Sequence, residues 1–101
     1  IGDTLVTTSV NSVNINDGVN VYPNPASDNV KIEFSLVHDA AYIITIKDLS
    51  GRVVYQLDKK VYKAGSNAVL IPVAELLTGT YVYSILDDRN KTLATGKMIK
   101  L

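Results

Sequence analysis

The feature that most constrains this chain is a short-range alternation of apolar and polar residues, broken at regular intervals by turn residues. In the clearest run, residues 30–35, Val30, Ile32 and Phe34 alternate with polar residues. The same period of two recurs at residues 42–47 and 81–86. This period is typical of β-strands with one dry and one wet face. Turn residues separate such runs at intervals of about ten residues, which favours an all-β fold.

The pattern predicts seven or eight short strands, and no segment of the chain has convincing helical periodicity. Only residues 74–77 are good helix formers, and they are long enough for one helical turn. A chain of 101 residues, 47 % of them hydrophobic, has room for one modest core. We therefore predict a single antiparallel β-sandwich of about seven strands.

The first residues differ from the rest in composition. Residues 1–18 are rich in Ser, Thr and Asn, with spaced valines that do not alternate cleanly. A linker and a loosely paired strand both fit this composition, and we favour the linker. We therefore expect a linker over residues 1–18 and a folded domain over residues 19–101. The chain does not open with the basic and apolar regions of a signal peptide, and it has no apolar run long enough to span a membrane.

The charged residues and the missing residue types exclude several functions. Ten basic and ten acidic residues leave no net field, so nucleic acid is not an expected partner. The absence of cysteine rules out thiol catalysis and disulfides. His38 is the only histidine, too few for a zinc site and without evident triad partners, so we interpret it as a solvated loop residue. Asp87 and Asp88 fit a hairpin turn better than a calcium loop. We expect no catalytic residue, no metal and no cofactor.

Tyrosines offer the remaining candidate for a binding site. Tyr81 and Tyr83 share one face of a predicted strand, and such rings can form a platform on which sugars or bases stack. Core packing is the more usual role for tyrosines on an alternating strand. With no Trp in the chain and no basic cluster beside them, we interpret both as core residues.

Four motifs, in a fixed order, set this chain apart from an ordinary sandwich. They are Tyr22, Pro23, Asn24 and Pro25; a turn that includes Asp48 and Gly51; Gly79 with Tyr81; and Gly96, Lys97, Met98, Ile99, Lys100 and Leu101. Together they resemble the type A family of C-terminal sorting domains of the type IX (Por) secretion system of Bacteroidetes. The resemblance covers residues 19–101. It implies an immunoglobulin-like sandwich, in agreement with the strand pattern.

The resemblance implies a non-catalytic signal that directs a parent protein across the outer membrane. The implied partners are the outer-membrane translocon, its shuttle protein and a sortase-like signal peptidase, together with a covalently attached upstream cargo. The parent would pass through the periplasm and reach the cell surface or the medium. The implied cleavage lies just before the sandwich, in the segment that precedes Val19.

The terminal motif, residues 96–101, is the part that the resemblance ties most closely to secretion. We expect Lys97 and Lys100 to contact the translocon, since exposed lysines add little stability. For Met98, Ile99 and Leu101, direct contact and a role in folding remain equally open. A further expectation is that the strand offers its edge to a receptor by strand addition, or pairs with a second copy in a weak homodimer. The alternative function is an immunoglobulin- or fibronectin-like accessory module that binds carbohydrate or acts as a spacer.

Overall fold

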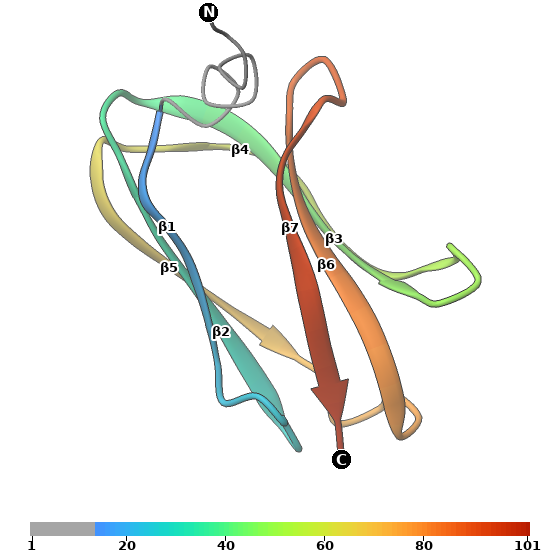
Figure 1. Ribbon diagram of the computed structural model, residues 1–101. Coiled ribbons are helices and arrows are strands. Elements are labelled where there is room, and N and C mark those ends of the chain that lie inside the picture. The colour runs from blue at the N-terminus through green and yellow to red at the C-terminus, as the bar shows by residue number, and fades with distance from the viewer. Residues whose placement is uncertain (1–13) are drawn as a thin grey trace, which may run out of the picture.

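The computed structural model describes residues 14–101, which form seven β-strands (Figure 1). In chain order they are β1 (Ile15–Tyr22), β2 (Asn29–Leu36), β3 (Ala40–Asp48), β4 (Val53–Tyr62), β5 (Gly65–Pro72), β6 (Gly79–Asp87) and β7 (Thr92–Lys100). One sheet has the order β1-β2-β5 and the other has the order β4-β3-β6-β7. All neighbouring strands within the two sheets are antiparallel.

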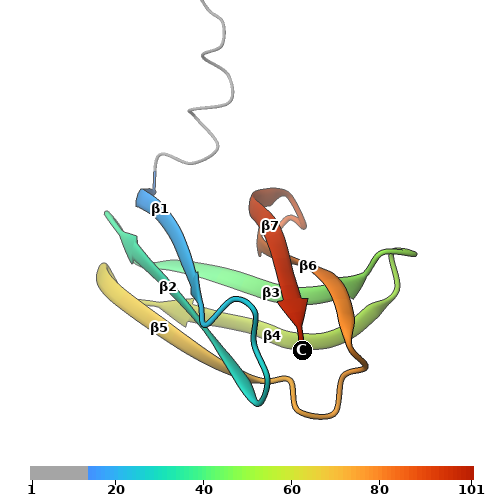
Figure 2. The ribbon, with the colours of Figure 1, turned by 60° about the horizontal axis from the view of Figure 1, so that its bottom comes forward.

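The two sheets face each other as the layers of a sandwich (Figure 2). Strand β1 is an edge strand of the first sheet and β7 an edge strand of the second, and the two lie side by side along one side of the sandwich (Figures 1 and 2). The prediction of a single all-β, immunoglobulin-like sandwich of about seven antiparallel strands is confirmed.

The core fills the space between the sheets with alternate residues of each strand. In β2 the alternation is complete, with Val30 and Ile32 having no exposed surface. The other side chains without exposed surface are Ala26, Ile44, Ile46, Ile71, Ile85 and Met98. Burying one such aliphatic side chain stabilises a fold by about 1.5–3 kcal/mol. At one end of the core, the Phe34 ring meets the Tyr62 ring edge-on, with 5.4 Å between centroids.

Two hairpins are closed in the same way, by an aspartate at the end of the first strand. Asp48 Oδ1 accepts hydrogen bonds from the backbone N–H groups of Ser50 and Arg52, each at 3.0 Å. Asp87 Oδ1 accepts from the N–H groups of Arg89 and Lys91, each at 2.9 Å. The turn after Asp48 also needs a residue at a φ of 92°, which Gly51 adopts without steric cost. Both predicted turns are confirmed.

The fold starts earlier in the chain than we expected. β1 begins at Ile15, which pairs with Leu36 and is 7 % exposed, so residues 15–18 of the predicted linker belong to the sandwich. The pairing register shifts between Asn16 and Val19, and this irregularity interrupts the period of two that would have revealed the strand. Residues 1–13 of the predicted linker lie outside the described residues.

Two smaller expectations also change. The residue pattern favours one strand over residues 53–57 and another at residues 61–62, but both belong to the single strand β4, and a register shift against β3 hides its continuity. Residues 74–77 make a turn and no helix: the N–H of Leu76 donates to the carbonyl oxygen of Val73 at 3.0 Å.

Candidate recognition surfaces

The first motif is folded against the last strand. The Asn24 side-chain oxygen accepts a hydrogen bond from the N–H of Ile99 at 3.0 Å, and its Nδ2 donates to the carbonyl oxygen of Lys97 at 3.1 Å. Both X-Pro peptide bonds of the motif, before Pro23 and before Pro25, are cis. The side chain of Asn24 therefore takes the place of a neighbouring strand along this part of β7.

Ala26 continues this contact one step further. Its N–H donates to the carbonyl oxygen of Ile99, and its own carbonyl oxygen accepts from the N–H of Leu101, both at 2.8 Å. The two bonds form a parallel bridge opposite Lys100, and Ala26 has no exposed surface. We call residues 23–26 the strap. It pairs with the outer edge of β7 from the Lys97 carbonyl to the Leu101 N–H, so these backbone groups are already bonded and not free to pair with another strand.

The terminal motif has an inward side that belongs to the core. Met98 has no exposed surface, and Lys100 is only 8 % exposed, with its Nζ donating to the Leu101 backbone oxygen at 2.8 Å. Gly96 lies opposite Tyr83, and a Cβ at this position would overlap the Tyr83 ring. Lys100 is therefore not exposed as we expected, since its alkyl chain is buried with the core face of the strand.

The outward side of the same motif is accessible. Ile99 is 40 % exposed and Leu101 is 63 % exposed. Lys97, two residues before Ile99, is exposed as well. Lys97 pairs with Val82 and Ile99 with Thr80, so their side chains share the outer face of the four-stranded sheet. We call Lys97, Ile99 and Leu101 the terminal face. It contains the three exposed residues of the terminal motif.

The second and third motifs meet in a groove of about 390 Å³. The β3–β4 hairpin contributes Leu49, which is 72 % exposed, and the β5–β6 connection contributes Leu77, which is 81 % exposed. The third motif is fixed by Tyr81, whose hydroxyl donates to the carbonyl oxygen of Leu77 at 2.6 Å. Tyr81 is only 6 % exposed, so its buried ring holds this wall of the groove in place.

The electrostatics of the second motif are local to its turn. The hydrogen bond from the Ser50 hydroxyl is the largest influence that lowers the pKa of the Asp48 carboxyl, and the Arg52 N–H and guanidinium act in the same direction. The Arg52 Nε lies 3.2 Å from Asp48 Oδ2, and the Arg52 side chain is 76 % exposed. An ion pair this exposed adds little stability, so the aspartate serves mainly to shape the hairpin.

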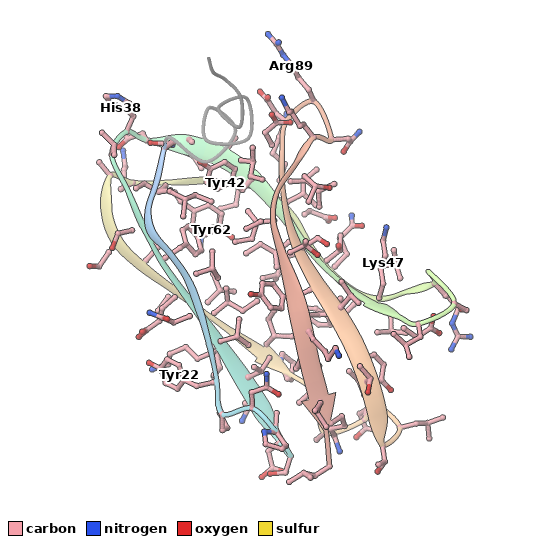
Figure 3. All side chains as sticks on the ribbon, in the orientation of Figure 1. Tyr22, His38, Tyr42, Lys47, Tyr62 and Arg89 are labelled. Atoms are coloured by element: carbon pink, nitrogen blue, oxygen red, sulfur yellow. The ribbon has the colours of Figure 1, made fainter. Side chains whose placement is uncertain are left out.

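The residues considered for other chemistry have structural roles. His38 is exposed in the β2–β3 turn (Figure 3). Its backbone N–H donates a hydrogen bond to Asn14 Oδ1. Asp87 closes its hairpin, and Tyr81 and Tyr83 pack against the core. Among residues 14–101, no group of three or more possible metal ligands occurs, and no helix is long and apolar enough to cross a membrane.

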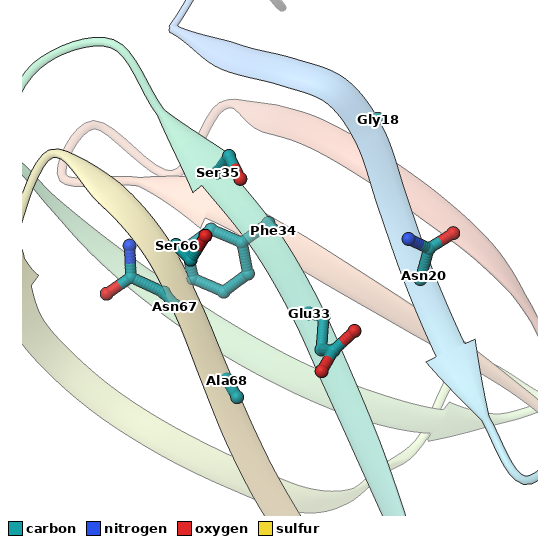
Figure 4. Close-up of a pocket in the computed structure, with 8 residues that line it drawn as sticks. All are labelled: Gly18, Asn20, Glu33, Phe34, Ser35, Ser66, Asn67 and Ala68. Carbon is teal, nitrogen blue, oxygen red and sulfur yellow. The ribbon is translucent and has the colours of Figure 1, made fainter.

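The outer face of the three-stranded sheet has a shallow hollow of about 360 Å³ (Figure 4). It is lined largely by small or polar residues, among them Asn20, Glu33, Ser35 and Ser66. The one aromatic residue in its lining, Phe34, is 3 % exposed and belongs to the core. The lining of the hollow thus contains no exposed aromatic ring.

Comparison with protein families decides between a sorting domain and an accessory module. Residues 20–100 match the secretion system C-terminal sorting domain. The chain belongs to this family. A search of curated proteins found no match. The sorting domain is a signal for type IX secretion, and such domains are in general non-catalytic. A sorting domain is attached to a cargo protein, and the secretion system exports that cargo to the cell surface or secretes it.

Sequence reasoning missed one residue of this arrangement. Ala26 bridges β7 although it lies among turn residues, and its only signal was a lone small apolar side chain directly after Pro25. Sequence reasoning left open whether Met98, Ile99 and Leu101 contact a receptor or stabilise the fold, and the structure buries Met98 but exposes Ile99 and Leu101.

Proposed function

We propose that the type IX translocon and its shuttle protein recognise this sorting domain through the terminal face, made of Lys97, Ile99 and Leu101. The observation that carries the proposal is the division of the terminal motif: Met98 and Lys100 are buried while these three residues are exposed. The strap pairs with the outer edge of β7 in the C-terminal part of the strand. Recognition of this part therefore uses side chains and not strand addition. On β7, strand addition or the pairing of a weak homodimer would be confined to the part of the strand before Lys97.

The domain itself acts without catalysis and without a cofactor, and a sortase-like peptidase removes it at the cell surface. We place the cleaved bond upstream of Asn14. The carbonyl oxygen of Asn14 accepts from the N–H of Val37 at 3.0 Å, and its Nδ2 donates to the Tyr42 hydroxyl at 2.9 Å. A peptidase needs an extended, accessible substrate, and residues from Asn14 onward are already held by the fold. N-terminal sequencing of the released domain tests this placement.

The main test is an export assay in a type IX-competent strain. A periplasm-directed fluorescent reporter is fused to the full chain, and its surface and medium fractions are compared with those in a translocon-deficient strain. The double variant Lys97→Ser/Ile99→Ser is expected to stay in the periplasm while keeping its thermal stability. A matched control is Leu70→Ser, because Leu70 is 61 % exposed on the other sheet.

The outcomes separate the two roles of the terminal motif. Normal export of the double variant would overturn recognition through the terminal face. Export of the unmodified fusion that persists in the translocon-deficient strain would overturn the type IX route for this chain. Retention of the control together with the double variant would show that the assay responds to lost apolar surface in general.

A further inference from the structure

We infer that the outer face of the four-stranded sheet, centred on Lys47, Val82 and Lys97, docks onto an acidic protein surface of the export machinery. This inference rests on the proposed function and extends it from the terminal motif to a residue of β3. The three residues, which we call the basic row, come from three adjacent strands.

The pairing register places the basic row in one line across the sheet. Lys47 pairs with Val82, and Val82 pairs with Lys97. Neighbouring strands lie about 4.8 Å apart, so the two lysine backbones are separated by about 10 Å with the valine between them. Figure 3 shows Lys47 on the side of the sheet that faces away from Tyr42 and Tyr62. Both ammonium groups therefore belong to one outer surface.

The charge of the basic row is not balanced locally. Within residues 14–101 the ion pairs join Arg52 to Asp48 and Lys63 to Asp39, and neither involves the basic row. The neighbouring rows on the same face are uncharged: they hold Thr45, Ser84 and Thr95 on one side, and Thr80 and Ile99 on the other. A partner with carboxylates opposite the two lysines would meet no competing acidic group here.

Apolar side chains accompany the charges. Val53 pairs with Lys47 and is 45 % exposed, and Ile99, in the row next to Lys97, is 40 % exposed. Together with the partly buried Val82 they give the face an apolar stripe between and beside the lysines. Each lysine near an anionic membrane surface contributes only about 1 kcal/mol of binding free energy, which is too little for two lysines to hold the domain there. A protein surface can use both parts, with charge guiding the encounter and apolar contact holding the complex.

The test uses the full-chain reporter fusion in a type IX-competent strain. Lys47→Glu is expected to lower export about tenfold, equivalent to roughly 1.4 kcal/mol of binding free energy. Lys59→Glu, on the exposed part of β4, is the matched control and should leave export within about twofold. Lys47→Arg keeps the positive charge and should keep export. Lys97→Glu is the second variant, and circular dichroism establishes that each variant is folded.

Zero-length carbodiimide coupling checks the chemistry directly, because it joins a lysine amine to a carboxylate in contact, with loss of water. We expect a coupled peptide between Lys47 or Lys97 and an acidic residue of a type IX component, and loss of the coupling at position 47 in Lys47→Arg. Normal export of folded Lys47→Glu and Lys97→Glu would overturn the inference and leave the sorting function intact. Failure of the unmodified fusion to be exported would overturn the sorting function as well. Charge-dependent binding of the purified fusion to phosphatidylglycerol vesicles, without protein coupling, would replace the protein partner with a membrane.

Discussion

The side-chain oxygen of Asn24 accepts a hydrogen bond from the backbone N–H of Ile99 at 3.0 Å, across 75 residues of chain. The Nδ2 of the same amide donates to the carbonyl oxygen of Lys97, so one side chain satisfies two backbone groups of β7. The first motif of the sorting domain is thus hydrogen-bonded to the terminal motif. Motifs that are far apart in the sequence form one unit at this end of the sandwich.

We expect Asn24→Ala to lower the free energy of unfolding by about 1–2 kcal/mol, because it leaves two backbone groups of the β7 edge without a protein partner. Urea denaturation measures this loss. Asn20→Ala is the matched control, since Asn20 lies exposed on the outer face of the other sheet and should change stability by less than about 0.5 kcal/mol. The amide of Ile99 should also exchange hydrogen faster in Asn24→Ala. Equal stability of the two variants would contradict a bracing role for the strap.

The sequence was sufficient to predict the strands in which alternation is unbroken. In β2 every second residue is buried, and its pattern of residues was also the clearest in the chain. It failed where the pairing register shifts, at the start of β1 and within β4, because an inserted residue reverses the faces that a period of two predicts. The hairpin turns at Asp48 and Asp87 were predictable because they depend on local residue types.

The candidate site was predictable only in part. The terminal motif was found as a unit, but its division into core and surface residues depends on where β7 lies in the sheet. Lys100 appeared in the sequence as an exposed charge, but its side chain shares the core face of β7 with Met98 and is only 8 % exposed. The basic row is likewise invisible in the sequence, since it joins Lys47 and Lys97 through the register of three strands.

The two sides of β7 should respond differently to truncation of a side chain. Met98→Ala is expected to cost about 2–5 kcal/mol, because the Met98 side chain has no exposed surface and would leave a cavity. Ile99→Ala, at 40 % exposure, should cost less than about 1 kcal/mol. Thermal or urea denaturation gives both values. If Ile99→Ala proved as destabilising as Met98→Ala, its effect on export could no longer be assigned to contact with the translocon.

Gly96 and Tyr83 should be coupled. Gly96→Ala is expected to destabilise the domain by about 1–3 kcal/mol, because a Cβ would overlap the Tyr83 ring. In the background of Tyr83→Ala, where the ring is absent, the same glycine substitution should cost much less. A double-mutant cycle of unfolding free energies measures the difference. An unchanged cost in the two backgrounds would show that the glycine is needed for a reason other than the ring.

Acid should weaken the β3–β4 hairpin through Asp48. The pKa of this carboxyl is lowered, chiefly by the hydrogen bond from the Ser50 hydroxyl, so near the usual aspartate pKa of about 3.9 the native state binds fewer protons than the unfolded state. The stability that Asp48 contributes is therefore fully present above that pH and is lost as pH falls through the lower native pKa. Asp48→Asn preserves the size of the side chain but cannot ionise.

We expect the difference in unfolding free energy between the unmodified domain and Asp48→Asn to be positive at pH 6 and to shrink below about pH 4. Urea denaturation of both proteins from pH 6 to pH 3 measures it. The pKa values of Asp39 and Asp87 are lowered as well, mainly by the backbone N–H groups of Ala64 and Lys91, but both residues remain in the two proteins and cancel in the difference. A difference that stays constant with pH would mean that the carboxylate acts through its shape alone and not through its charge.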